Sequence, residues 1–466
     1  MKLHTVFTLH KITGLAFGAV LFLLGFTGFF LDHDNFDVLW DVSVSDSFLP
    51  DSIVEKKQKA FNAYKIDANN PKHILAGSRM GLFVSFDGGN HFKKSLFQQV
   101  LAIEPDRKGY QENFQIIYAA TVNGIYLSTD GGKKWKNIAL KNQVVESFSL
   151  YDGYIYAVVD KRDVYKVDLK TLETRQLNLK DISAKVLPKQ VRLSRLVRDL
   201  HYGRGLFNGD ISLYINDFLA FLMVFLAISG FVIYFSIRKI RAKKTVNRRY
   251  FKLWIKMHSN SIILFSFIPM LFIFFITGVF LDHTDLFRNT LKQTIFDTRY
   301  LPPVYKSLST DIWGFDYDGK TYRIGNRLGV FGSEDLQNWH LESKGFAYRI
   351  KRAGSQLLVS GMGSPNRVLS DKGWVLLKNT PHMPRDVYQL GGKTEFYNPK
   401  NARLPQLAST PLYYIMLGLH DGKLLYGQWV FINDAAVAAG IILLFTGFIK
   451  WRRKKQKIHN KLPKKG

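Results

Sequence analysis

Six of the twelve histidines occupy matched positions in two similar halves of this 466-residue chain. The matched pairs are His10 with His258, His33 with His283, and His201 with His420. Imidazole nitrogens bind metal ions, and two imidazoles from facing helices are what a six-coordinate haem iron requires. The histidines could therefore hold metal cofactors, provided that the elements carrying them bring each residue close to its counterpart.

An internal duplication produces these matched positions. The string FTGFFLDH (Phe26 to His33) recurs as ITGVFLDH (Ile276 to His283), each time at the end of an apolar run. A second signature, Leu-His-x-Gly followed by Ile-Asn-Asp, occupies Leu200 to Asp217 and recurs at Leu419 to Asp434. The repeat predicts two units, each reading helix, outside domain, helix.

Four apolar runs without charged residues predict transmembrane helices. They cover residues 12–31, 218–237, 262–281 and 435–449. A bilayer needs roughly 20 apolar residues per helix, so three runs span as they stand. The fourth reaches that length by including Trp429 to Asp434. The sequence therefore predicts an α+β membrane protein with four transmembrane helices and all-β outside domains, and with the lipid bilayer as its surroundings.

The predicted domain boundaries follow from these runs. They are transmembrane helix 1 (1–33), a first periplasmic β domain (34–199), transmembrane helix 2 (200–238), a basic cytoplasmic loop (239–256), transmembrane helix 3 (257–283), a second periplasmic β domain (284–418), transmembrane helix 4 (419–451) and a basic cytoplasmic tail (452–466).

The net charge of +28 is concentrated beside the apolar runs. Arg238 to Lys256 holds nine Lys or Arg residues, and Lys450 to Lys465 holds nine more. Because short basic segments stay in the cytoplasm, both termini are predicted to be cytoplasmic and the β domains periplasmic, in a bacterial inner membrane. This placement favours a topological role for the charge over a nucleic-acid partner.

The chain contains no cysteine. Disulfides, thiolate metal sites and the covalent attachment of c-type haem are therefore excluded. No Gly-x-Gly-x-x-Gly string follows a predicted strand, so no nicotinamide or flavin site is indicated.

The two outside segments are predicted to consist of β-strands. Their strand and hairpin pattern repeats about every 40 residues, which is typical of β-propeller blades. Ser85 to Phe92 and Ser128 to Trp135 resemble the Asp-box hairpins of sialidases and many other propellers. In those proteins the box is a structural turn. Weaker blades follow at Ser333 to Trp339 and at Ser370 to Trp374. The two segments are expected to combine into one propeller or to form two facing β lobes.

The histidine positions allow two interpretations. His10 and His33 are separated by roughly 35 Å of helix at about 1.5 Å per residue, so ligands would exist at both membrane faces. Histidine at a helix exit can instead be a simple cap. Asp217 and Asp434 likewise either favour a helix N-terminus or accept a hydrogen bond from a ligand histidine.

Each predicted helix also carries a small hydroxyl residue followed by glycine. These steps are Thr27-Gly28, Ser229-Gly230, Thr277-Gly278 and Thr446-Gly447. Small residues let neighbouring membrane helices approach closely. We therefore interpret the four steps as packing notches.

The framework resembles the PepSY-associated transmembrane family of bacterial inner-membrane proteins. The resemblance rests on Leu9 to Gly14, on the two Leu-His-x-Gly signatures, and on the four hydroxyl-glycine steps. The family includes ferric-siderophore reductases that bind b-type haem through helix histidines. The resemblance implies one or two haem b groups whose iron is held by His10, His258, His201 and His420. His33 and His283 are substitutes for either outer ligand.

Two functions remain open from the sequence. In the first, the chain carries electrons across the membrane through haem b, from a quinol or a redox partner protein to a periplasmic acceptor such as a ferric chelate. In the second, it is a non-catalytic, membrane-anchored propeller that binds a periplasmic ligand or partner. Both imply an intact membrane framework, and only the first requires the histidine pairs to meet.

Overall fold

The computed structural model describes residues 3–108, 111–180, 186–259, 262–307 and 311–459. The chain divides into two compact units, the helix unit and the β unit. The helix unit comprises Met1–Asp34, Val191–Phe296 and Tyr413–Gly466, and the β unit comprises Asn35–Gln190 and Asp297–Leu412. Both outside segments of the chain therefore contribute to one unit. Residues 260–261 of predicted helix 3 and 460–466 of the predicted tail lie outside the described residues.

Three helices in the described part of the chain are long and apolar enough to cross a membrane. They are α1 (Leu3–Asp32), α5 (Ile211–Arg241) and α10 (Val430–His459). The apolar helix α7 (Ile262–Asp282) contains Pro269, and its described apolar stretch, Phe267–Asp282, is shorter than a span. The chain is a membrane protein with three candidate spans, and the predicted span at residues 262–281, transmembrane helix 3, stays a prediction.

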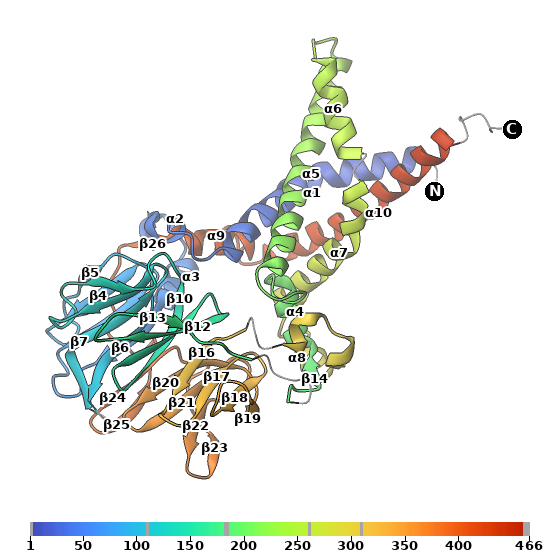
Figure 1. Cartoon of the computed structure of the whole chain (residues 1–466). Helices are drawn as coiled ribbons and strands as arrows, with labels where there is room; N and C mark the ends of the chain where they lie inside the picture. Colours follow the sequence, from blue (N-terminus) through green and yellow to red (C-terminus); the bar gives the residue numbers. More distant parts are fainter. Residues whose placement is uncertain (1–2, 109–110, 181–185, 260–261, 308–310, 460–466) are drawn as a thin grey trace. The chain divides into compact units, whose positions relative to one another are not determined.

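Shorter elements complete the helix unit (Figure 1). They are α4 (Leu193–His201), α6 (Arg248–Ser259), α8 (Arg288–Gln293), α9 (Leu412–His420) and the two-stranded sheet of β14 (Gln190–Arg192) with β15 (Ile295–Asp297). Much of the predicted basic loop 239–256 is helical, because α5 continues to Arg241 and α6 begins at Arg248.

An apolar core holds the helix unit together. Helix α1 packs against α5 and α10, and α7 packs against α4 and α10. The buried residues between them include Leu21, Leu222, Leu271 and Phe275. Gly440 permits the close approach of α10 to α7, since a Cβ atom there would lie 2.7 Å from the Phe275 ring.

Antiparallel sheets make up the β unit. Residues 35–190 contain three four-stranded sheets: β2 (Phe61–Ile66), β3 (Ile74–Ser78), β4 (Gly81–Ser85) and β5 (Lys93–Leu96); β6 (Val100–Lys108), β7 (Gln111–Thr121), β8 (Gly124–Ser128) and β9 (Lys136–Ala139); and β10 (Val145–Tyr151), β11 (Tyr154–Val159), β12 (Asp163–Asp168) and β13 (Thr174–Gln176). Residues 297–412 contain two more and a two-stranded sheet: β16 (Gly314–Tyr317), β17 (Tyr322–Gly325), β18 (Gly329–Ser333) and β19 (His340–Lys344); β20 (Ala347–Ala353), β21 (Gln356–Gly361), β22 (Arg367–Ser370) and β23 (Gly373–Leu376); and β24 (Val387–Leu390) with β25 (Lys393–Phe396).

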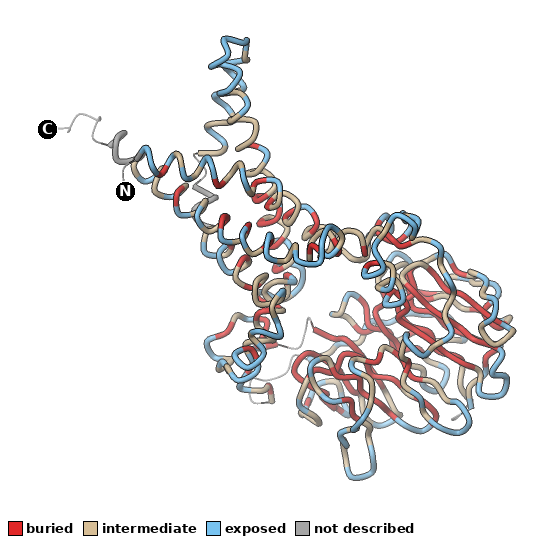
Figure 2. The backbone as a smooth tube through the Cα atoms, turned by 180° about the vertical axis from the view of Figure 1, so that it is seen from behind, coloured by how far each residue is buried: buried red, intermediate tan, exposed pale blue. Residues whose placement is uncertain are grey.

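These sheets close into one propeller-like ring. The first strands contact one another in the order β2, β6, β10, β16, β20 and β24, and β24 contacts β2 again. Buried residues concentrate in the strands of the β unit, and every residue of β2, β3 and β4 is buried (Figure 2). The two outside segments thus share one ring. Small elements flank it: α2 (Val38–Asp41), β1 (Ser43–Ser45), η1 (Asp46–Phe48), α3 (Asp51–Val54), η2 (Glu55–Ala60), η3 (Thr298–Tyr300), η4 (Pro303–Lys306) and β26 (Ser409–Pro411), which pairs with β1.

The Asp-boxes are structural turns in the β unit. The Asp130 carboxylate accepts hydrogen bonds from the backbone N–H groups of Lys133 and Lys134 and from the Ser128 hydroxyl. Asp335 accepts equivalent bonds in the fourth sheet. The box side chains therefore satisfy backbone donors at the hairpin tips.

A buried charge network joins three of the inner strands. Lys65 Nζ lies 3.3 Å from a Glu104 oxygen and 3.0 Å from Asp386, and Lys351 Nζ lies 2.7 Å from Glu104. Burial alone would raise the pKa of Glu104, but Lys351, Lys65 and Arg107 outweigh it and lower that pKa. Each charge in the network therefore depends on its partners.

Candidate functional site

Four of the predicted histidines form two close pairs within the helix unit. The ring centres of His10 and His258 are 6.3 Å apart, and those of His201 and His420 are also 6.3 Å apart. The ring planes are inclined by 80° in the first pair and by 59° in the second. We call them the inner pair and the outer pair, after the predicted topology.

Different elements carry the two pairs. His10 lies within the long helix α1 and His258 near the end of α6, whereas His201 and His420 end the short helices α4 and α9. Gly203 and Gly422 have positive φ angles of 62° and 75°, so the chain turns sharply after each short helix. This requirement explains the glycine of the Leu-His-x-Gly signature.

A hydroxyl group contacts the Nδ1 atom of every paired histidine. The Nδ1–oxygen distances are 2.8 Å for His10 with Thr446, 2.7 Å for His258 with Ser229, 3.2 Å for His201 with Thr277, and 2.9 Å for His420 with Thr27. Each hydroxyl also donates its proton to a carbonyl oxygen of its own helix. The hydroxyl oxygen must then accept from Nδ1–H, and this tautomer leaves Nε2 as the free lone pair of each imidazole.

The glycine after each hydroxyl residue lies beside the same imidazole ring. A Cβ atom at Gly28 or Gly278 would sit 3.4 Å from Cε1 of His420 or His201, and one at Gly447 or Gly230 would sit 3.8 Å from Cε1 of His10 or His258. A side chain at these positions would fill the space along the ring edge. Each hydroxyl-glycine step therefore lies beside one histidine, with the hydroxyl at Nδ1 and the glycine at the ring edge.

Each of these contacts joins a residue of one half of the duplication to a residue of the other. Each histidine is held by a hydroxyl of the opposite half and faces a histidine of the opposite half. The functional residues that sequence reasoning missed are therefore Thr27, Ser229, Thr277 and Thr446. The sequence feature that could have identified them is the Ser-Gly or Thr-Gly step that recurs in all four predicted helices.

The Ile-Asn-Asp signatures fix the histidines within each half. Asn216 Nδ2 donates to the His201 carbonyl oxygen at 2.9 Å, and Asn433 Nδ2 donates to that of His420 at 2.9 Å. Both asparagines are buried. The signature therefore anchors the backbone at the end of each short helix.

His33 and His283 each contact an aspartate of their own half. His33 Nε2 lies 3.0 Å from an Asp217 oxygen, and His283 Nε2 lies 2.8 Å from an Asp434 oxygen. Each contact joins the exit of one apolar helix to the start of the next within the same half. Asp217 and Asp434 thus partner these two histidines.

The geometry of the pairs fits a metal bound inside a macrocycle. With a metal–nitrogen bond of about 2 Å, two imidazoles on opposite sides of one ion have ring centres roughly 6 Å apart. No group of three or more His, Asp or Glu side chains able to hold an ion occurs in the residues that the structure describes. Two opposed imidazoles suit haem iron, whose other four ligands come from the porphyrin.

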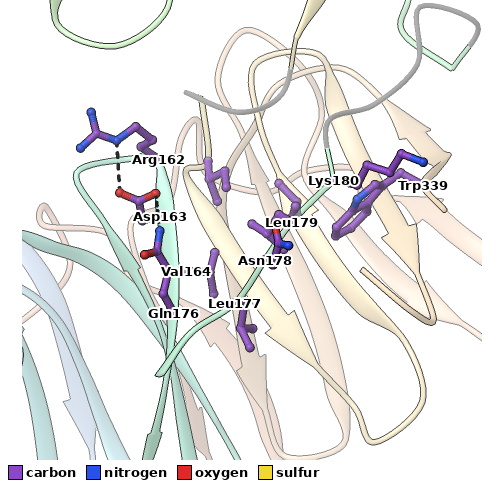
Figure 3. A pocket seen from close by; sticks show the side chains of 11 residues that line it. Arg162, Asp163, Val164, Gln176, Leu177, Asn178, Leu179, Lys180 and Trp339 are labelled. Carbon is purple, nitrogen blue, oxygen red and sulfur yellow. Dashed lines mark hydrogen bonds and ion pairs between the residues drawn. The ribbon is translucent and has the colours of Figure 1, made fainter. Parts of the chain in front are cut away.

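A separate surface pocket lies in the β unit (Figure 3). Its volume is about 350 Å³, and its lining includes Arg162, Asp163, Gln176 and Trp339. The Asp163 carboxylate is already bonded to Arg162 at 3.2 Å and to Gln176 at 3.0 Å. The pocket contains none of the predicted site residues.

Comparison with known proteins gives one family match. The model of the PepSY-associated TM region matches residues 7–454. No match was found among curated proteins.

Several solved structures are similar to the chain at low identity. An ancestral GH74 enzyme is 11% identical with a TM-score of 0.31, and the match covers 70% of this chain and 33% of that enzyme, so the chain spans about a third of its length. YCF48 from Cyanidioschyzon merolae is 10% identical with a TM-score of 0.29, covering 68% of this chain and 71% of that one. The Swd1 β-propeller domain of Myceliophteria thermophila is 9% identical with a TM-score of 0.30, covering 66% of each chain.

Proposed function

Because the chain belongs to the family of the PepSY-associated TM region, we propose that it is a haem b protein that transfers electrons across a bacterial inner membrane to a periplasmic acceptor. The observation that carries the proposal is the pair of matched histidine couples, each 6.3 Å between ring centres. In each couple the Nδ1 atoms are occupied by hydroxyls and the Nε2 atoms are left for a metal.

In this proposal the histidines bind the haem iron and the hydroxyl residues orient the histidines. His10 and His258 would hold one haem iron, and His201 and His420 would hold a second. When bound, each haem supplies a one-electron carrier whose iron has no open position, which suits electron transfer better than oxygen chemistry. The hydroxyls hold the imidazoles in one tautomer and orientation. Because the chain has no cysteine, both groups would be held without covalent attachment.

The donor and acceptor follow from the same reasoning. A quinol or a redox partner protein would supply the electrons. A ferric chelate outside the membrane is the acceptor that the family resemblance favours, which would make the chain a membrane-bound ferric reductase. Basic residues beside the candidate spans, such as Arg238, Arg241 and Lys450, support cytoplasmic placement of these helix ends.

The closed ring of the β unit favours a second candidate function. A propeller presents a rigid surface to ligands, so the chain could instead be a non-catalytic, membrane-anchored binding or assembly protein. In that case the histidine pairs would be packing contacts within the helix unit.

An absorption spectrum of the purified chain from haem-replete cells separates the two functions. The proposal expects a sharp Soret band with α and β bands on reduction, and a pyridine assay that identifies haem b. The double variant His10→Ala/His420→Ala, which breaks both pairs, should be colourless while retaining the helix and sheet content of the parent. Colourless, folded parent protein would eliminate the haem proposal.

A further inference from the structure

Lys450 departs from the internal duplication at a position close to the inner pair. In α5 the residue four positions after the hydroxyl of Ser229 is Ile233. In α10 the residue four positions after Thr446 is Lys450. Four residues are about one helical turn, so Lys450 lies one turn beyond the hydroxyl that contacts His10. One of two matched positions beside the inner pair therefore carries a cation.

The Lys450 ammonium group lies next to the inner pair. Its Nζ atom is 4.6 Å from the centre of the ring of Phe7, which is three residues before His10 on α1. The positive charge is close enough to act on both His10 and His258. The side chain is half-buried. Lysines near the ends of membrane helices commonly extend toward the headgroups, whereas this one is held against α1.

The segments that surround the inner pair contain no acidic residue. Residues 1–31, 218–281 and 435–466, which include α1, α6 and most of α5, α7 and α10, hold neither Asp nor Glu. The same segments hold nine Lys or Arg residues between Arg238 and Lys256 and nine more between Lys450 and Lys465. A half-buried ammonium group is stabilised by an anionic partner. Such a partner would have to come from outside these segments.

Haem b carries carboxylates of its own, the propionates of the porphyrin. A propionate and an ammonium group form a charge-assisted hydrogen bond, which is about twice as strong as a neutral one. An ionised carboxylate that enters the helix unit without a partner would carry a large desolvation cost. The haem proposed for the inner pair thus supplies the anion that the surrounding segments lack, and Lys450 supplies the cation that a propionate needs.

We propose that Lys450 binds a propionate of the inner haem. The inference rests on the proposed function, because it requires a haem at the inner pair. Beside the outer pair, the residues four positions after Thr27 and Thr277 are Leu31 and Leu281. These positions are apolar, so the contribution of Lys450 is specific to the inner haem. A phospholipid headgroup is the other source of an anion, and the experiment separates the two.

Haem release from the purified full chain tests this contact. Lys450→Met removes the charge and should speed release of the inner haem into excess apomyoglobin about tenfold, the effect of losing one charge-assisted hydrogen bond. The outer haem should leave at the parent rate, which also verifies that the variant is folded. Lys450→Arg should stay close to the parent. Lys11→Met, which removes an exposed charge next to His10, is the matched control and should leave both rates unchanged.

Protohaem dimethyl ester identifies the partner of Lys450, because its esterified propionates carry no charge. The parent and Lys450→Met, produced in haem-deficient cells and reconstituted with the ester, should release the inner ester at the same rate. Equal acceleration by Lys450→Met with protohaem and with the ester would overturn the proposal, since the side chain would then act through helix packing.

A phospholipid partner would make Lys450→Met release protohaem as slowly as Lys11→Met does, and this result would also overturn the proposal. In that case the haem-loaded parent would leave the proposed function intact. A parent chain that takes up no haem would overturn the proposed function together with this inference.

Discussion

The helix unit and the β unit contain parts of the same two halves but retain the duplication to different degrees. In the helix unit each key contact occurs twice, as in Thr27 with His420 and Thr277 with His201. In the β unit one half supplies three four-stranded sheets, while the other supplies two and a two-stranded sheet. A ring of sheets requires only that neighbouring sheets pack against one another. The paired histidines and hydroxyls contact residues of the opposite half, which requires that both halves keep these residues at matched positions. The symmetry persists where side chains of the two halves contact one another in pairs.

Single histidine substitutions provide the largest expected effect. His258→Ala should remove the inner haem and His420→Ala the outer one, so each variant should lose about half of the bound haem, because one imidazole cannot hold the iron on both sides. The pyridine assay against protein concentration measures this. His340→Ala is the control, since that residue is exposed in the β unit.

Loss of all haem from either single variant would contradict independent pairs. Loss of haem from His340→Ala would contradict the assignment of pigment to the helix unit alone.

Acid should affect the β unit through its buried carboxylates. Burial alone would raise the pKa of Glu146, but Lys161, Arg79 and Arg349 outweigh it and lower that pKa to about 2. A carboxylate with a lowered folded-state pKa stabilises the fold above its unfolded pKa of about 4.5 and loses that contribution as pH falls toward the folded value. Unfolding of the β unit, followed by circular dichroism, should therefore become easier between about pH 4.5 and pH 2.

Removing one charge of the Lys65 network should also destabilise the β unit, in this case at neutral pH. Glu104→Gln leaves Lys65 and Lys351 with less compensation and should lower the free energy of unfolding by about 3–5 kcal/mol. Glu395→Gln, at an exposed position, should stay within about 0.5 kcal/mol of the parent. Equal stability of Glu104→Gln and the parent would refute the importance of the network.

The sequence predicted where helices and sheets lie along the chain better than it predicted which side chains contact one another. Apolar runs located α1, α5 and α10, and the blade period located most sheets of the β unit. The sheet of β24 and β25 was missed because no Asp-box marks it. The apolar stretch described in α7, which contains Pro269, is shorter than a span, so predicted transmembrane helix 3 stays a prediction. The duplication predicted the two histidine pairs that meet, whereas His33 and His283, which it matched in the same way, contact Asp217 and Asp434.

The sequence could not assign the hydroxyl residues to the histidines. A Ser-Gly or Thr-Gly step is common in membrane helices and suggests close packing. Only the arrangement of helices in space reveals that Thr446 reaches His10 from a position more than 400 residues away. Likewise, the sequence predicted that Asp217 could accept a hydrogen bond from a ligand histidine, but it did not identify His33 of the same half as that partner.

An Asp-box substitution should give a moderate effect confined to the β unit. Asp130→Ala removes the acceptor for two backbone donors and the Ser128 hydroxyl, so the free energy of unfolding should fall by about 1–3 kcal/mol. The haem content should stay unchanged. Asp371→Ala, at an exposed position in the weaker repeat of Ser370 to Trp374, is the control. A matching loss of stability there would show that the box bonds are unimportant.

The smallest effect should come from the hydroxyls, and it distinguishes the two pairs without removing either. Thr277→Val keeps the shape of the side chain but removes the acceptor for His201 Nδ1–H, leaving a less basic imidazole that stabilises ferric iron less. The outer haem should therefore remain bound with a raised midpoint potential, and the inner haem should keep its potential. Ser229→Ala should raise the potential of the inner haem and leave that of the outer haem unchanged. Thr277→Ser should keep the parent potential because it retains the hydroxyl oxygen. Potentiometric titration of the α band resolves the two haems. If Thr277→Val and Thr277→Ser gave the same potentials as the parent, the hydroxyls would be packing residues only, as the sequence alone suggested.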